Sequence, residues 1–258
     1  MTTSHHGPIL EQLRGAIAGL ERGPRSASSI LRPLPFGIPT IDRHLPGGGL
    51  RLGALHEIVP GGPAHEHTAA CILFTAGILA RLPGSVLWCL SSRDLFAPGL
   101  ARAGLHPDRV LYAETYREAD LMPLIEEGVR FPGLAGVVGD IVHLSLTASR
   151  RLQLAAEETA VPVFLLRRSS RKAEASETAS AAATRWRLSA LSSRALASPG
   201  LARGRWQVEL LRCRGAPAGT EACRWQLEAC DETGHLALAA DLADGSRPQA
   251  EFDRAAAG

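Results

Sequence analysis

The sequence predicts an α/β protein with a mostly parallel central sheet flanked by helices, and with antiparallel strands toward the C-terminus. Short apolar segments alternate with longer helical segments between residues 55 and 167. The hydrophobic period then changes to two after residue 184. The chain has 258 residues, 45% of them apolar, which is enough for one large domain with a buried core. Strands that alternate with helices of this length indicate right-handed βαβ units.

The alternating part contains five expected strands and four expected helices. The apolar segments expected as strands are residues 55–59, 86–91, 110–113, 135–139 and 161–167. Helical patterns are expected over residues 68–82, 95–103, 118–129 and 146–159. The first of these helices is apolar nearly all round, so we expect it to be buried.

The C-terminal part has the alternation of half-exposed strands. Trp186 and Leu188 alternate with Arg185 and Arg187, and the same period recurs near residues 205–210 and 224–229. Such strands are most simply antiparallel. Residues 168–183 contain few bulky apolar side chains, which predicts a mobile loop.

Three regions follow from this pattern. Residues 1–35 are expected to be an N-terminal helix and linker, residues 36–243 the core, and residues 244–258 a disordered polar tail. Within the first region, residues 9–22 carry an apolar stripe, which packs either on its own domain or on a neighbour.

Composition excludes several classes of protein. No apolar run is long enough to cross a bilayer, and no secretory signal is evident, so we expect a cytoplasmic protein without membrane contact. The five cysteines show no CxxC pairing, which favours reduced thiols. The pair His65 and His67 lacks the further ligands of a zinc site, so no metal is expected. Lys172 is the single lysine, and the other basic residues are arginines.

Residues 36–68 carry an ordered set of short motifs. Ile41-Asp42 is followed by a glycine-rich turn at residues 47–50 and by Gly-Ala-Leu-His-Glu-Ile at residues 53–58. This order resembles the entry to the ATPase core of the RecA family. The resemblance implies a RecA-like core, and a phosphate loop Gly-x-x-x-x-Gly-Lys-Ser/Thr directly after the first strand.

The matching stretch, residues 61–68, has lost most of that loop. Gly61, Gly62 and Thr68 are present, but Glu66 replaces the second glycine and His67 replaces the lysine. His67 is shorter than lysine and mostly neutral at pH 7, and Glu66 repels a triphosphate. We therefore expect a vestigial nucleotide loop that binds an anion weakly at most, no cofactor, no catalytic residue and no useful ATPase activity.

Two acidic positions of RecA-like cores have uncertain counterparts. Arg93 falls where the family's catalytic glutamate would lie, although Asp94 could substitute after a small shift. Asp140 ends the apolar segment at residues 135–139, where the family places a magnesium-binding aspartate. Asp140 is either that vestige or simply a polar residue at the end of a strand.

A basic segment follows the last parallel strand. Arg168, Arg171, Lys172, Arg185 and Arg187 lie where RecA recombinases have their second DNA-binding loop, and they suit contacts to phosphates. The alternative is a solvated charged loop. The first such loop is expected to be short, because residues 141–147 pass almost directly into a helix.

Over residues 36–242 the chain resembles the ImuA family, RecA-like accessory proteins of a bacterial mutagenic repair cassette. The resemblance implies a role in SOS-induced translesion synthesis beside ImuB, an inactive relative of Y-family polymerases, and an error-prone C-family DNA polymerase. RecA and DNA are further candidate partners. Two alternatives stay open: an active RecA/KaiC-type ATPase acting on DNA, and a RecA-like regulator of a non-DNA protein.

Overall fold

The structure is a computed structural model, and it describes residues 32–168, 179–193, 203–216 and 223–239. The predicted helix at residues 9–22 and the predicted tail at residues 244–258 lie outside these ranges, as does most of the predicted mobile loop. Among the described residues, no helix combines the length and the apolar character needed to span a membrane.

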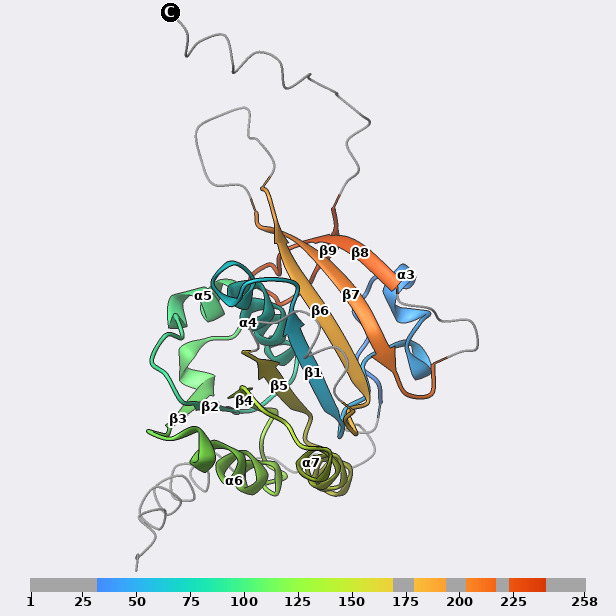
Figure 1. Cartoon of the computed structure of the whole chain (residues 1–258). Coiled ribbons are helices and arrows are strands. Elements are labelled where there is room, and N and C mark those ends of the chain that lie inside the picture. Colours follow the sequence, from blue (N-terminus) through green and yellow to red (C-terminus); the bar gives the residue numbers. More distant parts are fainter. Residues whose placement is uncertain (1–31, 169–178, 194–202, 217–222, 240–258) are drawn as a thin grey trace, which may run out of the picture.

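Nine strands form a single sheet in the order β3-β2-β4-β5-β1-β6-β7-β8-β9 (Figure 1). The parallel part comprises β1 (Leu55–Pro60), β2 (Val86–Leu90), β3 (Val110–Glu114), β4 (Gly136–Ile141), β5 (Val163–Arg167) and β6 (Thr184–Leu191). The antiparallel part adds β7 (Arg205–Cys213), β8 (Cys223–Glu228) and β9 (Ala237–Leu238). The predicted fold class is therefore confirmed.

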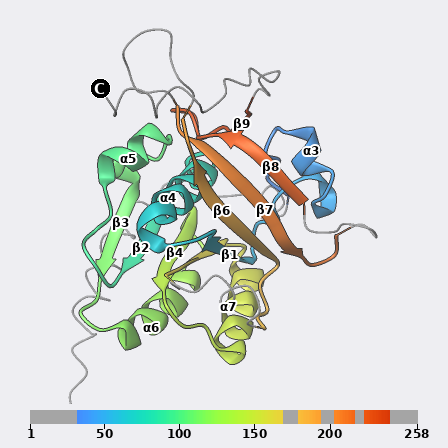
Figure 2. The same cartoon turned by 45° about the horizontal axis from the view of Figure 1, so that its top comes forward.

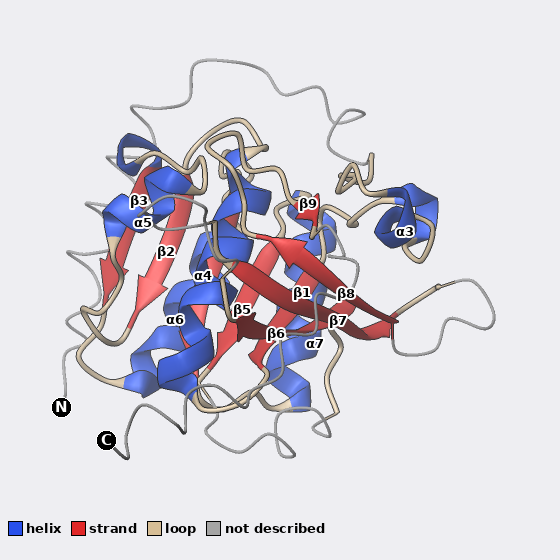
Figure 3. Ribbon diagram, turned by 90° about the horizontal axis from the view of Figure 1, so that it is seen from above, coloured by secondary structure: helices blue, strands red, loops and turns tan. Residues whose placement is uncertain are grey.

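Strand β6 joins the two parts of the sheet. It runs parallel to β1 on one side and antiparallel to β7 on the other. The alternation alone had suggested an antiparallel strand, which is correct for one edge of β6 only. Figure 3 shows β6, β7 and β8 continuing the sheet beyond β1.

Helices cover both faces of the parallel part (Figure 1). One face carries α4 (Ala64–Ala80) and α5 (Ala97–Arg102), and the other carries α6 (Glu118–Val129) and α7 (Leu146–Thr159). Two 3-10 turns, η1 (Pro46–Gly48) and η2 (Pro107–Arg109), lie in the connections. The short α3 (Pro39–Asp42) lies beside β7 and β8 (Figure 2).

The core consists of one apolar cluster on each face of the sheet. The cluster on the α4 face includes Phe36, Phe74 and Trp186, whose rings lie 5.5–5.9 Å apart. The segment with α3 thus seals the α4 face of the β6–β8 extension. The cluster on the other face lies between the sheet and the helices α6 and α7, and it extends across the parallel strands as far as Leu55 on β1.

A hydrogen-bonded chain ties β1 to β6 within the core. The Trp186 indole N–H donates to Thr184 Oγ1 at 2.8 Å. Thr184 Oγ1 lies 2.8 Å from His56 Nδ1, and His56 Nε2 lies 2.8 Å from the Arg51 carbonyl. Because a carbonyl only accepts, Nε2 carries the proton and Nδ1 accepts from the Thr184 hydroxyl. His56 is fully buried, and this burial lowers its pKa to about 4.

Candidate functional site

The connection from β1 to α4 is much shorter than a phosphate loop. Only Gly61, Gly62 and Pro63 separate the strand from the helix, because α4 begins at Ala64. The expected start at residue 68 was therefore wrong by one turn. Glu66, which replaces the second glycine of the loop, has a higher helix propensity than glycine, and its carboxylate in the first turn is favourable at a helix N-terminus.

The His67 side chain lies between this short loop and β6. Its Nδ1 accepts a hydrogen bond of 3.0 Å from the backbone N–H of Ala190 on β6. A Cβ atom on Gly62 would lie 2.7 Å from His67 Nε2, so the imidazole lies against the loop backbone. Where the RecA family places a lysine pointing at phosphates, this side chain is turned toward a neighbouring strand.

The loop backbone is also engaged with β6. The Gly61 N–H donates to the Leu188 carbonyl at 2.7 Å. A Cβ atom on Gly61 would come within 1.8 Å of Ser189 Oγ, which shows how closely β6 approaches. The Gly61 N–H is therefore not free to bind a phosphate oxygen. Thr68 lies half-buried one turn into α4.

At the other end of the site, one arginine joins the two acidic candidates. Arg168, directly after β5, donates from Nε to Asp140 Oδ2 at 2.5 Å. Its second guanidinium nitrogen donates to both carboxylate oxygens of Asp94, at 2.8 and 3.0 Å. Asp94 also accepts from Ser92 at 2.8 Å. A guanidinium thus lies between Asp140, the candidate for the family's magnesium-binding aspartate, and Asp94, the candidate to replace its catalytic glutamate after a small shift.

Burial and this pairing shift the pKa values of the three groups. Burial raises the pKa of Asp140, although the Arg168 guanidinium opposes the rise. Burial alone would raise the pKa of Asp94, but hydrogen bonds from Arg168 and Ser92 lower it overall. The bond to Asp140 raises the pKa of Arg168. The second carboxylate oxygen of Asp140, Oδ1, is buried and has no hydrogen-bond partner among the described residues.

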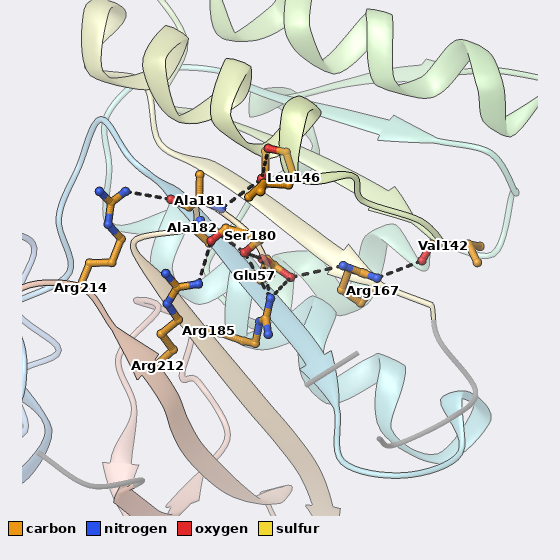
Figure 4. A network of polar contacts seen from close by, with 11 residues as sticks. Glu57, Val142, Leu146, Arg167, Ser180, Ala181, Ala182, Arg185, Arg212 and Arg214 are labelled. Carbon is orange, nitrogen blue, oxygen red and sulfur yellow. Dashed lines mark hydrogen bonds and ion pairs between the residues drawn. The ribbon is translucent and has the colours of Figure 1, made fainter. Parts of the chain in front are cut away.

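A second charged cluster lies under the sheet on the α7 face (Figure 4). Glu57 in the middle of β1 is fully buried and accepts from Arg185 at 3.1 and 3.2 Å and from Arg167 at 3.4 Å. The Ser180 hydroxyl also donates to Glu57. From the sequence, Glu57 was recognised only as part of the motif at residues 53–58. Its buried, paired role could have been inferred from the presence of a carboxylate in the centre of an apolar strand. Such a group must be paired.

Comparison with known proteins gives the fold and the family. The crystal structure of the RadB recombinase aligns with a TM-score of 0.52 at 19% identity, covering 80% of this chain and all of that one. This likeness establishes the RecA-like fold. Protein ImuA from two strains of Caulobacter vibrioides, NA1000 / CB15N and ATCC 19089 / CIP 103742 / CB 15, is 36% identical over 249 residues. The match covers 91% of this chain and 99% of each relative.

The chain belongs to the ImuA family. No protein-family model matches it. Family membership and fold therefore come from two different comparisons, one of sequence with the ImuA proteins and one of structure with RadB.

In this ImuA-family chain, the predicted DNA-contacting residues lie in different surroundings. Arg168 is bound to Asp140 and Asp94, and Arg185 is buried against Glu57. Arg187, whose side chain is 17% exposed, pairs with Glu209 at 3.2 Å. Arg171 and Lys172 lie outside the described residues. DNA contact by this set stays a prediction, and the structure places Arg185 where its guanidinium faces a carboxylate.

The segment that corresponds to the first DNA-binding loop of RecA recombinases is short in this ImuA-family chain, as predicted. Strand β4 ends at Ile141 and α7 begins at Leu146, with Ser145 capping the helix through the Ala148 N–H at 3.1 Å. Among the described residues, no three His, Cys, Asp or Glu side chains are grouped to hold a metal ion.

Proposed function

We propose that this chain is a non-catalytic RecA-like accessory protein of SOS-induced, error-prone translesion DNA synthesis. Membership of the ImuA family supports a role in a mutagenesis cassette. On this proposal it works with an ImuB-like inactive relative of Y-family polymerases, and through it with an error-prone C-family DNA polymerase. A scaffold needs a stable fold and a binding surface, and it needs no nucleotide turnover.

The observation that supports the non-catalytic part is that groups at the positions of the RecA phosphate loop and of its acidic residues already bond to other parts of this chain. Phosphoryl transfer in this fold relies on positioned backbone N–H groups, a fixed positive charge and Mg²⁺. Here Gly61 donates to Leu188, and the His67 imidazole lies against Gly62. Arg168 does supply a positive charge, but Asp140 and Asp94 already neutralise it. A nucleotide would have to displace all of these interactions.

Phosphate release from the purified chain tests this part. We expect no release above that of a buffer blank, and ATP with Mg²⁺ should change the melting temperature little, because a ligand stabilises only as far as it binds. Thr68→Ala and Asp140→Ala serve as controls. A steady release that both substitutions abolish would contradict the proposal and support an active ATPase.

Affinity capture with and without DNA damage tests the cassette role. The tagged chain should co-purify with an inactive polymerase relative of the Y family, and more of it should be captured after damage. Capture should persist when the protein carries His67→Ala, because binding to the partner does not use the nucleotide site. Recovery of a partner unrelated to DNA, with no polymerase relative, would instead favour the regulator alternative.

A further inference from the structure

One face of the β6–β8 extension carries arginines from all three strands. Alternation in the strands places Arg187, Arg205 and Arg224 on the face opposite the Trp186 cluster. The strand register aligns Arg187 with Glu209 and Arg224, and Arg205 with Glu228. We call this surface the arginine face. Two further arginines at its lower end, Arg212 and Arg214, reach the segment at residues 180–182 (Figure 4).

The arginine face has an excess of positive charge. Among the described residues, six arginines lie there against two glutamates, an excess of four: Arg187, Arg203, Arg205, Arg212, Arg214 and Arg224 against Glu209 and Glu228. Both glutamates are already paired, Glu209 with Arg187 and Arg224 at 3.2 and 3.3 Å, and Glu228 with Arg203 at 3.8 Å.

Three of these arginines bind neutral oxygens only. Arg205 donates to the Gln226 side chain at 3.0 Å, Arg212 to the Ser180 carbonyl at 2.7 Å, and Arg214 to the Ala181 carbonyl at 3.0 Å. Within the ranges that the structure describes, none of the three forms an ion pair with a carboxylate. No described carboxylate neutralises these three charges, which suits an anionic partner.

The described helices do not extend over this surface. Helices α6 and α7 pack against β1, β2 and β4, and the β6–β8 extension continues beyond them (Figures 1 and 3). Arg212, Arg214 and Arg224 are exposed. Strand β7 has nine residues, so at about 3.4 Å per residue the face is roughly 30 Å long. That length equals about nine base-pair steps of duplex DNA at 3.4 Å each.

We propose that the arginine face binds the phosphodiester backbone of a nucleic acid. A protein partner would need an apolar or aromatic centre in its interface. The described outward residues of β6–β8 include no aromatic side chain, and the apolar ones, Leu191 and Leu211, lie near opposite ends of the face. Interfaces with nucleic acids are polar and strongly positive, as this face is. The proposal goes beyond the function above, because it requires neither ATP turnover nor a polymerase partner.

The absence of aromatic side chains from the described face also defines the form of nucleic acid. Proteins that prefer single strands stack bases on aromatic rings. A face that contacts phosphates alone binds according to charge density, which is higher in a duplex. The arginine face therefore binds a duplex at least as tightly as a single strand of the same length, and without sequence preference.

Fluorescence anisotropy of the full chain with labelled oligonucleotides tests the proposal. In R205Q/R212Q/R214Q, each removed cation has no carboxylate partner in the described structure, so the substitution leaves no described carboxylate unpaired. We expect a loss of duplex affinity of about tenfold or more, and a salt dependence weaker by about two to three units, close to 0.9 per lost contact. The matched control, R102Q/R130Q/R150Q, removes three exposed arginines from the helical layers and should change the affinity less than about twofold.

Further variants and competing ligands distinguish a nucleic-acid surface from the alternatives. R205K/R212K/R214K should retain the salt dependence of the wild type, because it preserves the charges, and unfolding curves confirm that each variant folds. The proposal is overturned if R171Q/K172Q abolishes binding while the substituted arginine face binds normally. It is also overturned if single strands bind about tenfold more tightly than duplex. Displacement of duplex by polyglutamate at equal charge concentration would indicate an acidic protein partner instead.

Discussion

The guanidinium of Arg168 is bonded to the carboxylate of Asp140 at 2.5 Å, at the position where the RecA resemblance places a magnesium ion. Asp140 is 3% exposed, so its charge needs a nearby cation. Arg168 provides one from within the chain and also binds Asp94. The same arginine is the first residue after β5, so this ion pair joins the ends of β4 and β5.

Removal of Arg168 should therefore destabilise the protein through Asp140. Arg168→Ala leaves a buried carboxylate without its cation, and we expect a loss of about 2–4 kcal/mol in unfolding free energy at neutral pH, measured by denaturant titration. The folded pKa of Asp140 is already raised by burial and should rise further in the variant. A raised carboxyl pKa favours folding only at low pH, so the loss should shrink as the pH falls toward 4.

Two comparisons control this prediction. Adding Asp140→Asn to Arg168→Ala should restore more than about 1 kcal/mol, because the unpaired charge is then absent. Arg93→Ala removes an ion pair of similar chemistry, with Glu114 at 2.7 Å, whose side chains are 78% and 44% exposed. It should cost about 0–1 kcal/mol. Equal losses from Arg168→Ala and Arg93→Ala would contradict the assignment of a buried ion pair.

The second prediction concerns Glu57, which is the counter-ion of two buried arginines. Glu57→Gln leaves Arg167 and Arg185 facing each other without a carboxylate, so the unfolding free energy should fall by about 3–5 kcal/mol. Glu157→Gln, in the exposed pair with Arg51, is the matched control and should cost less than about 1 kcal/mol. A small effect of Glu57→Gln would show that the cluster is not the main anchor between β1, β5 and β6.

The third prediction is a pH dependence that arises from His56. Burial lowers its folded pKa from 6.5 to about 4, so between these values the unfolded chain binds a proton that the folded chain does not. Stability should therefore fall as the pH decreases through this window, by roughly 3 kcal/mol in total from this group. Unfolding titrations at several pH values, for wild type and His56→Gln, isolate the effect. The penalty of the substitution should be smaller at pH 5 than at pH 7, and a constant penalty would refute the assignment.

The fourth prediction is that restoring the glycine and lysine of the phosphate-loop motif does not produce ATP hydrolysis. E66G/H67K recreates the second glycine and the lysine, yet α4 still begins close to β1 and Arg168 still holds Asp140 and Asp94. We expect phosphate release to stay at the level of the wild type. Vigorous hydrolysis by E66G/H67K would show that the lysine alone limited the site, and that the loop can open to accept a nucleotide.

Much of the fold could be predicted because it depends on local pattern. Alternating apolar strands and amphipathic helices indicated the parallel sheet, and the change to period two indicated the antiparallel extension, as the strand pairing confirms. The pattern did not reveal that β6 is parallel to β1, because hydrophobic period does not encode strand direction. Residue 185 looked solvent-facing in the alternation, although β1 and the segment with Ser180 cover its side chain.

The amino-acid pattern alone establishes that residues 61–68 lack the lysine and the second glycine of a phosphate loop, and that Asp140 follows the apolar segment at residues 135–139. Which side chains lie against this loop and against Asp140 depends on the three-dimensional packing. Arg168 and Asp140 are 28 residues apart, His67 and Ala190 are 123 apart, and Arg185 and Glu57 are 128 apart. The order of strands in the sheet brings these side chains together. Strand order depends on how whole crossovers pack, so charge pairs across it leave no periodic signal along the chain.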